Sequence, residues 1–275
     1  MPSSETTIYR TPGRSFASTS RAKQVGGIVG FLSTVIGTLL ALGILHPLGG
    51  TEDALAAAAT TTSDAGSAKL SVAVQAPVGG SLLMLRGDGA YDFRTGRGTL
   101  TLHLPPEYAV LYGTSTLKSI IDGDTTYMYD PARRAWAILS DSPPQSTLDV
   151  FTELVPDDPT QILDFLEPGG DVETVGEESL FGTETTHYRA NVSVSKLVDN
   201  APANVQQAVR ASGMVHDGDT LPVDVWVDEA GMMRRIELKG RLGEVDNVAL
   251  TLDLFDFGTD VDVKVPPPSK IYYGG

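Results

Sequence analysis

The chain contains no cysteine, which excludes several classes of protein at once. Disulfide scaffolds, iron–sulfur clusters, thiolate zinc sites, cysteine nucleophiles and thioether lipid anchors all require this residue. Basic residues are also scarce, because 20 Lys and Arg stand against 35 Asp and Glu and leave a net charge of −15. A body this acidic repels phosphate backbones, which argues against nucleic acid as a partner.

Motifs for catalysis, cofactors and metals are missing as well. The four histidines include no two with the close spacing of a metal pair. There is no G-x-S-x-G elbow, phosphate-binding loop or dinucleotide-binding glycine motif. The string Asp-Gly-Asp-Thr occurs at 122–125 and 217–220, but neither copy has the further oxygen ligands of a calcium loop, so we interpret both as tight turns. We therefore predict a protein that is not an enzyme and that has no cofactor and no metal.

Residues 25–48 form one long apolar segment without a formally charged residue. About 22 helical residues span roughly 33 Å, enough for a hydrocarbon core of about 30 Å. Basic residues precede the segment and acidic residues follow it, so we predict a single transmembrane helix in the plasma membrane, with residues 1–24 in the cytoplasm and the main domain outside. The alternative is a signal peptide cleaved near Ala56, but the apolar stretch is long for one.

Small residues recur at four-residue steps in this segment, beginning with a G-x-x-x-G motif. Such ladders let two membrane helices approach each other closely. They predict packing against an integral membrane-protein partner, although glycine is also simply common in membrane helices. The residues concerned are Gly26, Gly30, Ser33, Gly37 and Ala41.

The remainder of the chain divides into a predicted linker and one domain. Residues 49–68 are small, polar and alanine-rich and contain no aromatic residue, which is typical of a flexible linker. The extracytoplasmic domain is predicted to cover residues 69–275.

Apolar residues alternate with small or polar ones in several stretches of this domain, as in antiparallel strands with one buried face. The clearest stretches are 70–74, 100–104, 223–227 and 248–254. Turn signals lie between them at Asp88-Gly89, Asp122-Gly123, 229–231 and 257–258. Helical spacing appears only at 145–155, 158–166 and, more weakly, 203–212. The predicted fold class is therefore α+β, a curved antiparallel sheet covered by a few helices.

The apolar residues that alternate along three of these predicted strands are candidates for a binding site, because they share one face of the sheet. A sheet face covered by helices encloses either a filled core or an apolar pocket, and composition does not distinguish the two. The candidate pocket-lining residues are Leu100, Leu102, Leu104, Val223, Val225, Val227, Leu250, Leu252 and Leu254.

Three short sequence segments resemble those of a known family. They are Phe181-Gly182-Thr183 followed by Thr186-His187-Tyr188-Arg189; residues 221–228, LPVDVWVD, with Gly231 and Arg234-Arg235; and Phe255, Phe257-Gly258, Val261 and Val263 before Pro266. With the order of segments from 69 to 268, they resemble the LppX/LprG type of actinobacterial envelope proteins, which is related in fold to the lipoprotein carrier LolA. The resemblance implies a LolA-like half-barrel closed by helices, with an apolar cavity that in some members holds acyl chains of envelope lipids. It implies no enzyme and no cofactor. Members usually carry a lipobox cysteine, which is absent here, so the predicted helix replaces the acyl anchor.

Three functions follow as hypotheses. The first is a non-catalytic, membrane-anchored accessory subunit of an actinobacterial envelope membrane-protein complex, with a respiratory cytochrome assembly as the first choice. The alternative is a tethered lipid-binding or lipid-carrier protein of the envelope. A hydrolase would require His103, His187 or His216 to meet a nucleophile and an acid in a cleft.

Overall fold

A computed structural model describes residues 51–78, 81–123, 125–138, 172–200, 206–207, 210, 216, 218–242 and 245–273. The predicted cytoplasmic tail and transmembrane helix lie outside these ranges. The predicted helices at 145–155 and 158–166 and most of the one at 203–212 also lie outside them. Within the described ranges, no helix combines the length and the apolar character that crossing a bilayer requires.

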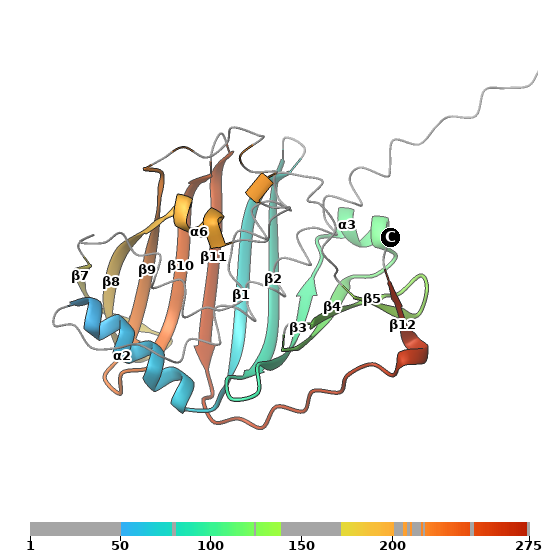
Figure 1. The fold of residues 1–275 in the computed structure, drawn as a ribbon, viewed down its shortest axis with the longest axis horizontal. Coiled ribbons are helices and arrows are strands. Elements are labelled where there is room, and N and C mark those ends of the chain that lie inside the picture. The colour runs from blue at the N-terminus through green and yellow to red at the C-terminus, as the bar shows by residue number, and fades with distance from the viewer. Residues whose placement is uncertain are drawn as a thin grey trace, which may run out of the picture.

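Twelve strands form one sheet, with β12 at one edge and β7 at the other (Figure 1). The strand order is β12-β6-β5-β4-β3-β2-β1-β11-β10-β9-β8-β7. Neighbours pair antiparallel, except that β12 runs parallel to β6. The strands are β1 (Ser67–Val78), β2 (Ser81–Asp92), β3 (Arg97–His103), β4 (Thr116–Asp122), β5 (Thr125–Asp130), β6 (Ala135–Ile138), β7 (Glu173–Leu180), β8 (Thr183–Ser193), β9 (Thr220–Asp228), β10 (Met233–Leu242), β11 (Val245–Phe255) and β12 (Ile271–Tyr273).

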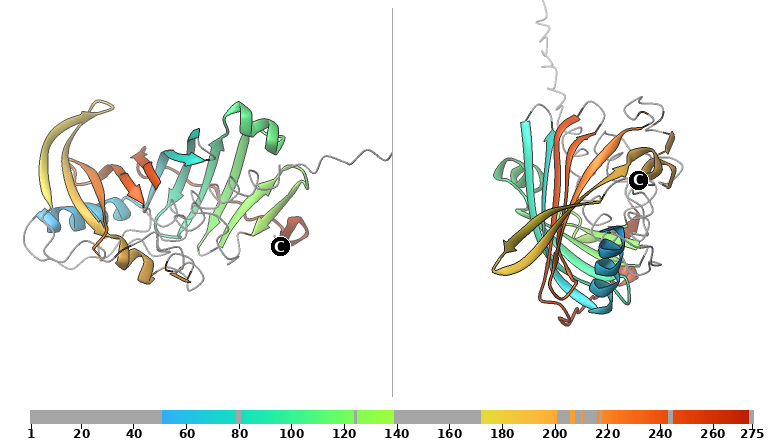
Figure 2. Two further views of the ribbon diagram at one scale, coloured as in Figure 1. Left: turned by 90° about the horizontal axis from the view of Figure 1, so that it is seen from above. Right: turned by 90° about the vertical axis from the view of Figure 1, so that its left-hand side faces the viewer.

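The described helices are few and short: α2 (Thr51–Asp64), α3 (Pro106–Tyr112), α6 (Val194–Asn200) and the 3₁₀ turn η1 (Pro268–Lys270). Figure 2 shows a twisted, curved sheet with α2 and α6 on the same side of it. We call that side the inner face and the opposite side the outer face. The predicted fold of an open, curved sheet with few helices is thus confirmed.

Residues 51–64 form helix α2, so the prediction of a flexible linker is wrong for this stretch. Alanine is the best helix former, and its small side chain lets a helix lie close to a sheet. Leu55, Ala58 and Ala59 are at most 2% exposed and belong to the main hydrophobic core. Thr62 Oγ1 accepts a hydrogen bond of 2.8 Å from the backbone N–H of Met233 at the start of β10. The alanine-rich residues that suggested a linker therefore form a helix that packs on β9 and β10.

The four alternating stretches lie in strands β1, β3, β9 and β11, as predicted. The turn predicted at Asp88-Gly89 is wrong, because both residues lie inside β2. Glycine is needed at positions 87 and 89 because β3 lies too close to β2 there for a side chain. A Cβ on Gly87 would lie 2.7 Å from Cδ2 of Leu102, and one on Gly89 would overlap the carbonyl oxygen of Thr99.

Candidate functional site

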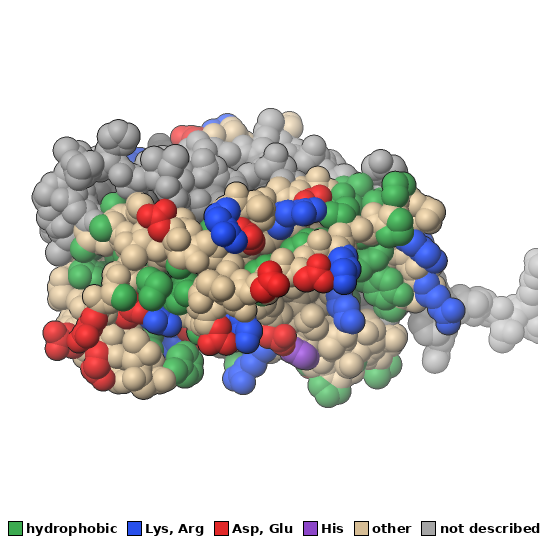
Figure 3. Space-filling view, turned by 90° about the horizontal axis from the view of Figure 1, so that it is seen from below, with side chains coloured by type: hydrophobic (Ala, Val, Ile, Leu, Met, Phe, Trp, Pro, Cys, Tyr) green, Lys and Arg blue, Asp and Glu red, His purple; other side chains and the backbone are tan. Residues whose placement is uncertain are grey.

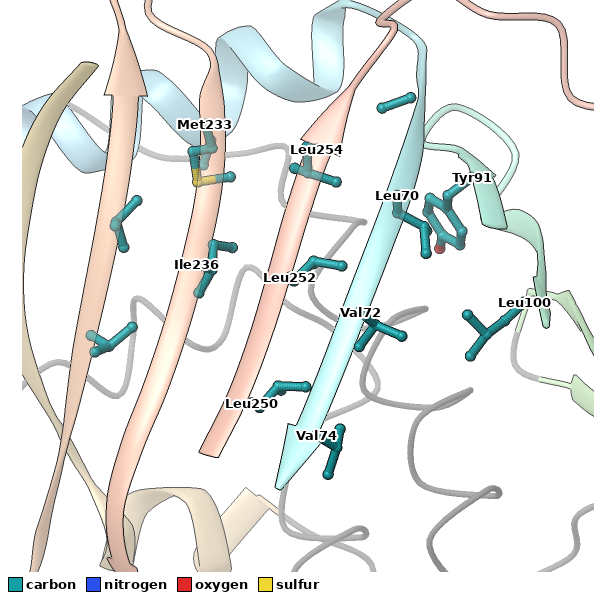
Figure 4. Packing of buried hydrophobic residues seen from close by; sticks show 14 of the residues in the cluster. Leu70, Val72, Val74, Tyr91, Leu100, Met233, Ile236, Leu250, Leu252 and Leu254 are labelled. Atoms are coloured by element: carbon teal, nitrogen blue, oxygen red, sulfur yellow. The ribbon is translucent and has the colours of Figure 1, made fainter. Parts of the chain in front are cut away.

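Strand register brings apolar side chains together on the inner face. Directly opposed residues on one face of an antiparallel pair have Cβ atoms about 4.5–5.5 Å apart. The opposed pairs of β1 and β11 are Leu70–Leu254, Val72–Leu252 and Val74–Leu250. Strands β10 and β9 continue the face with Ile236–Leu252, Leu238–Leu250, Val225–Ile236 and Val223–Leu238. Figure 4 shows the labelled side chains of β1, β10 and β11 on the same side of the sheet.

The same face extends in the other direction across β2, β3 and β4. Leu85 lies opposite Val74, and Leu102 lies opposite Leu117. Between them, Gly87 leaves room for the side chains of Leu102 and the neighbouring β1. One hydrophobic cluster therefore runs from α2 and β9 to β4.

Every residue that the sequence predicts to line a pocket belongs to this cluster. Each is buried, with an exposed fraction of 8% or less, and the set comprises Leu100, Leu102, Leu104, Val223, Val225, Val227, Leu250, Leu252 and Leu254. The residues predicted for helix packing in the membrane lie outside the described ranges: Gly26, Gly30, Ser33, Gly37 and Ala41.

Three buried polar side chains lie among the apolar residues of β2, β4 and β5 on the inner face. Ser119 on β4 is 2% exposed and Thr126 on β5 is 8% exposed. Tyr91 on β2 is 3% exposed, and burial, with a smaller contribution from the charge of Asp92, raises the pKa of its phenol to about 12. All three are therefore neutral at physiological pH. Sequence analysis missed Ser119, although its position between Leu117 and Ile121 places it in the apolar phase of the strand.

The outer face carries charged groups instead. Ion pairs across neighbouring strands include Arg97–Asp122 and Arg235–Asp253. Figure 3 views the molecule from below and shows acidic and basic side chains interspersed among hydrophobic and other ones on the described part of that side. The sheet is thus amphipathic, with one apolar face and one charged face.

His187, which is 5% exposed, lies at the centre of a polar cluster on the outer face. Its ring stacks on Trp226 with the centroids 4.2 Å apart and the planes at 14°. Its Nδ1 lies 2.9 Å from Oε1 of Glu178, and its Nε2 lies 2.6 Å from Oδ1 of Asp224. Arg189 donates a further hydrogen bond to the same Asp224 oxygen. This network joins β7, β8 and β9 near one edge of the sheet.

The other two histidines also have carboxylates as partners. His103 Nε2 lies 2.8 Å from Asp88 on the exposed surface, and the His216 backbone N–H donates to Asp219. In the part of the chain that the structure describes, none of the hydrogen bonds of these histidine rings joins them to a hydroxyl nucleophile. The hydrolase hypothesis therefore gains no support from them.

Metal chemistry gains no support either. At the first Asp-Gly-Asp-Thr string, the Asp122 carboxylate accepts a hydrogen bond from Arg97, and Gly123 has a φ of 60°, as a tight turn requires. Among the described residues, no group of His, Asp and Glu has the arrangement of a metal site.

Comparison of sequences finds a relative that matches part of the chain. No protein-family model matches the chain. An uncharacterized 31.2 kDa protein of Streptomyces griseus, from the rplA-rplJ intergenic region, is 30% identical over 116 residues. The matched region covers 40% of this chain and 37% of that protein, so it spans little more than a third of the relative.

Comparison of structures covers more of the chain. LprF from Mycobacterium bovis is 12% identical, with a TM-score of 0.47, over 78% of this chain and 96% of that chain. The lipoprotein LppX from Mycobacterium tuberculosis is 17% identical, with a TM-score of 0.47, over 78% of this chain and 100% of that chain. LppX, which is among these similar structures, belongs to the type that the sequence resembles. A LolA superfamily protein from Nitrosomonas europaea is 11% identical, with a TM-score of 0.29, over 81% of this chain and 97% of that chain. These likenesses concern the fold alone and assign no function to this chain.

Proposed function

We propose that this protein binds lipids of the cell envelope and that their acyl chains lie on the inner face of its sheet. The observation that carries the proposal is the continuous apolar cluster from β9 to β4, of which Figure 4 labels residues on β1, β2, β3, β10 and β11. The outer face, with its ion pairs, is suited to water. A sheet with one apolar face requires an apolar partner on that face.

The inner face is much wider than the described helices. Twelve strands at about 4.8 Å spacing measure about 53 Å across. Helix α2 has 14 residues, so it is about 21 Å long and about 10 Å wide, and it packs on β9 and β10. We propose that an acyl chain contributes to the cover of the part from β11 to β4, where it meets leucine and valine side chains.

The energy of such binding is adequate without any polar contact. Each buried methylene contributes about 0.8 kcal/mol, so ten of them contribute about 8 kcal/mol. That is the free energy of a complex with a Kd of about 1 μM, before the cost of ordering the chain is subtracted. Long acyl chains are therefore better ligands for this face than short or polar molecules.

The sequence supports the same function and adds a location. The resemblance to the LppX/LprG type implies an apolar cavity and a role in the envelope. We propose further that residues 25–48 anchor the protein in the plasma membrane and hold the sheet domain outside, close to the outer leaflet.

Native mass spectrometry of the full-length protein, released from detergent, tests the proposal. We expect a species with the added mass of one lipid. A matched pair of isosteric variants locates the lipid, since Val72 on β1 is 1% exposed and Val175 on β7 is 42% exposed. Val72→Thr places a hydroxyl under the acyl chain and should lower the bound fraction about tenfold, whereas Val175→Thr should leave it unchanged. A wild-type protein without added mass would mean that its own side chains fill the face, and the proposal would be wrong.

The accessory-subunit hypothesis remains a prediction from the sequence. It depends on the small-residue ladder at 26–41, which lies outside the described ranges, and the contacts of the described residues do not favour it over lipid binding. Affinity purification of the tagged protein in mild detergent distinguishes the two. Recovery of the protein with lipid and without another membrane protein would exclude the accessory role.

A further inference from the structure

Ser119 lies on the apolar inner face, at the β4 end of the hydrophobic cluster. It is the third residue after Thr116 in β4, a strand with β3 on one side and β5 on the other. Its neighbours along the strand and across it are all apolar: Leu117, Ile121, Leu100 and Met128. These four side chains offer no hydrogen-bond donor, and their one acceptor is the weakly accepting thioether of Met128.

The hydroxyl of Ser119 is buried without a hydrogen bond. The residue is 2% exposed, and Ser119 Oγ is the side-chain atom of the described residues that is both buried and without a hydrogen-bond partner. Burying a polar group in this way costs free energy, so such groups are rare in folded proteins and call for an explanation. Alanine would fill nearly the same space without that cost.

We infer that the Ser119 hydroxyl donates a hydrogen bond to the carbonyl oxygen of an acyl ester or amide bound on the inner face. This inference rests on the proposed lipid-binding function and deepens it, because it names the ligand class and one point of attachment. An acyl carbonyl that enters an apolar interior loses its hydrogen bonds to water, just as the serine hydroxyl has done. Pairing the two groups satisfies both, so the face prefers an acyl ester to a plain hydrocarbon.

A competition between two neutral probes measures this preference. Methyl palmitate carries the ester carbonyl, and octadecane is a hydrocarbon of the same chain length. Full-length protein, transferred to amphipol to remove free detergent, is incubated with both probes in equal amounts. The protein-bound fraction is separated by gel filtration, extracted and quantified by gas chromatography, with empty amphipol as the blank.

The wild-type protein and two variants of position 119 give the expected pattern. The ratio of bound ester to bound hydrocarbon should be about five- to tenfold higher for wild-type protein than for Ser119→Ala. Ser119→Ala should bind octadecane as wild type does and should melt at the same temperature or slightly higher, because the hydroxyl has no partner in the ligand-free protein. Ser119→Thr keeps the hydroxyl and should restore the preference for the ester.

The outcomes separate this inference from the function on which it rests. Binding of both probes with the same ratio in wild type and Ser119→Ala would overturn the role of Ser119 and leave lipid binding intact. Binding of neither probe would overturn both. A lower melting temperature for ligand-free Ser119→Ala would show that the hydroxyl has a structural partner, and this too would overturn the inference.

Discussion

Thr62→Val tests whether helix α2 belongs to the folded domain. Thr62 is 1% exposed; its Oγ1 accepts the Met233 N–H at 2.8 Å and donates to the Ala58 carbonyl at 2.6 Å. Valine keeps the shape of the side chain but leaves the Met233 N–H buried without this acceptor, which costs about 1–3 kcal/mol. We expect the free energy of unfolding to fall by about 2 kcal/mol. In a domain of this size, that lowers Tm by about 4–8 °C.

Thr61→Val is the matched control, since it makes the same change one residue earlier in the helix. The Thr61 hydroxyl bonds only within α2, to the Ala57 carbonyl at 2.8 Å, and the bond is exposed. Water replaces it in the variant, so the loss should stay below about 0.5 kcal/mol. Urea unfolding of the full-length protein, followed by far-UV circular dichroism, measures both variants. Equal unfolding midpoints for the two would mean that α2 does not dock through Thr62, and the reasoning would fail.

Two further predictions concern hydrogen-bonded polar groups of the sheet. His187→Leu should lower the free energy of unfolding by about 3 kcal/mol, because the buried Asp224 carboxylate loses a partner, whereas the exposed His103→Leu should change it by less than about 0.5 kcal/mol. Equal effects in urea unfolding would contradict this difference. Burial alone raises the pKa of Asp130, but hydrogen bonds, first among them the one from Tyr272 on β12, lower it from 3.8 to about 2. The carboxylate therefore stabilises the protein above about pH 4 and loses this effect as the pH falls toward 2. Asp130→Asn should remove about 1 kcal/mol at pH 6 and should weaken the pH dependence between 4 and 2; an acid-unfolding curve equal to that of wild type would refute the assignment.

The alternating stretches were the most reliable guide to the fold. In a strand, successive side chains point to opposite faces, so the residues that share a phase also share a face whatever their partners are. For this reason Val223, Val225 and Val227 could be placed on one buried face before any pairing was known, and Trp226 on the other. The same argument could have identified Ser119, whose phase is that of Leu117 and Ile121.

The linker predicted for residues 51–64 and the turn predicted at Asp88-Gly89 were wrong for the same reason. Both were predicted from local composition alone. An alanine-rich stretch without aromatic residues is typical of a linker, yet Ala58 and Ala59 are buried because β9 and β10 accept a helix at close range. Asp-Gly is typical of a turn, yet Gly89 lies in β2 because the backbone of β3 leaves no space for a side chain there. In both places a neighbour distant in sequence determines the structure.

The sequence by itself indicated which classes of chemistry were available, where β1, β3, β9 and β11 lie and which of their residues share a buried face. These properties depend on residue types and on a period of two along the chain, and both can be read without a partner. Only the tertiary structure decided that twelve strands join in one sheet, that residues 51–64 pack on it and that Ser119 lacks a hydrogen bond. Each of these depends on strand order and register, which bring together residues more than a hundred positions apart, such as Thr62 and Met233.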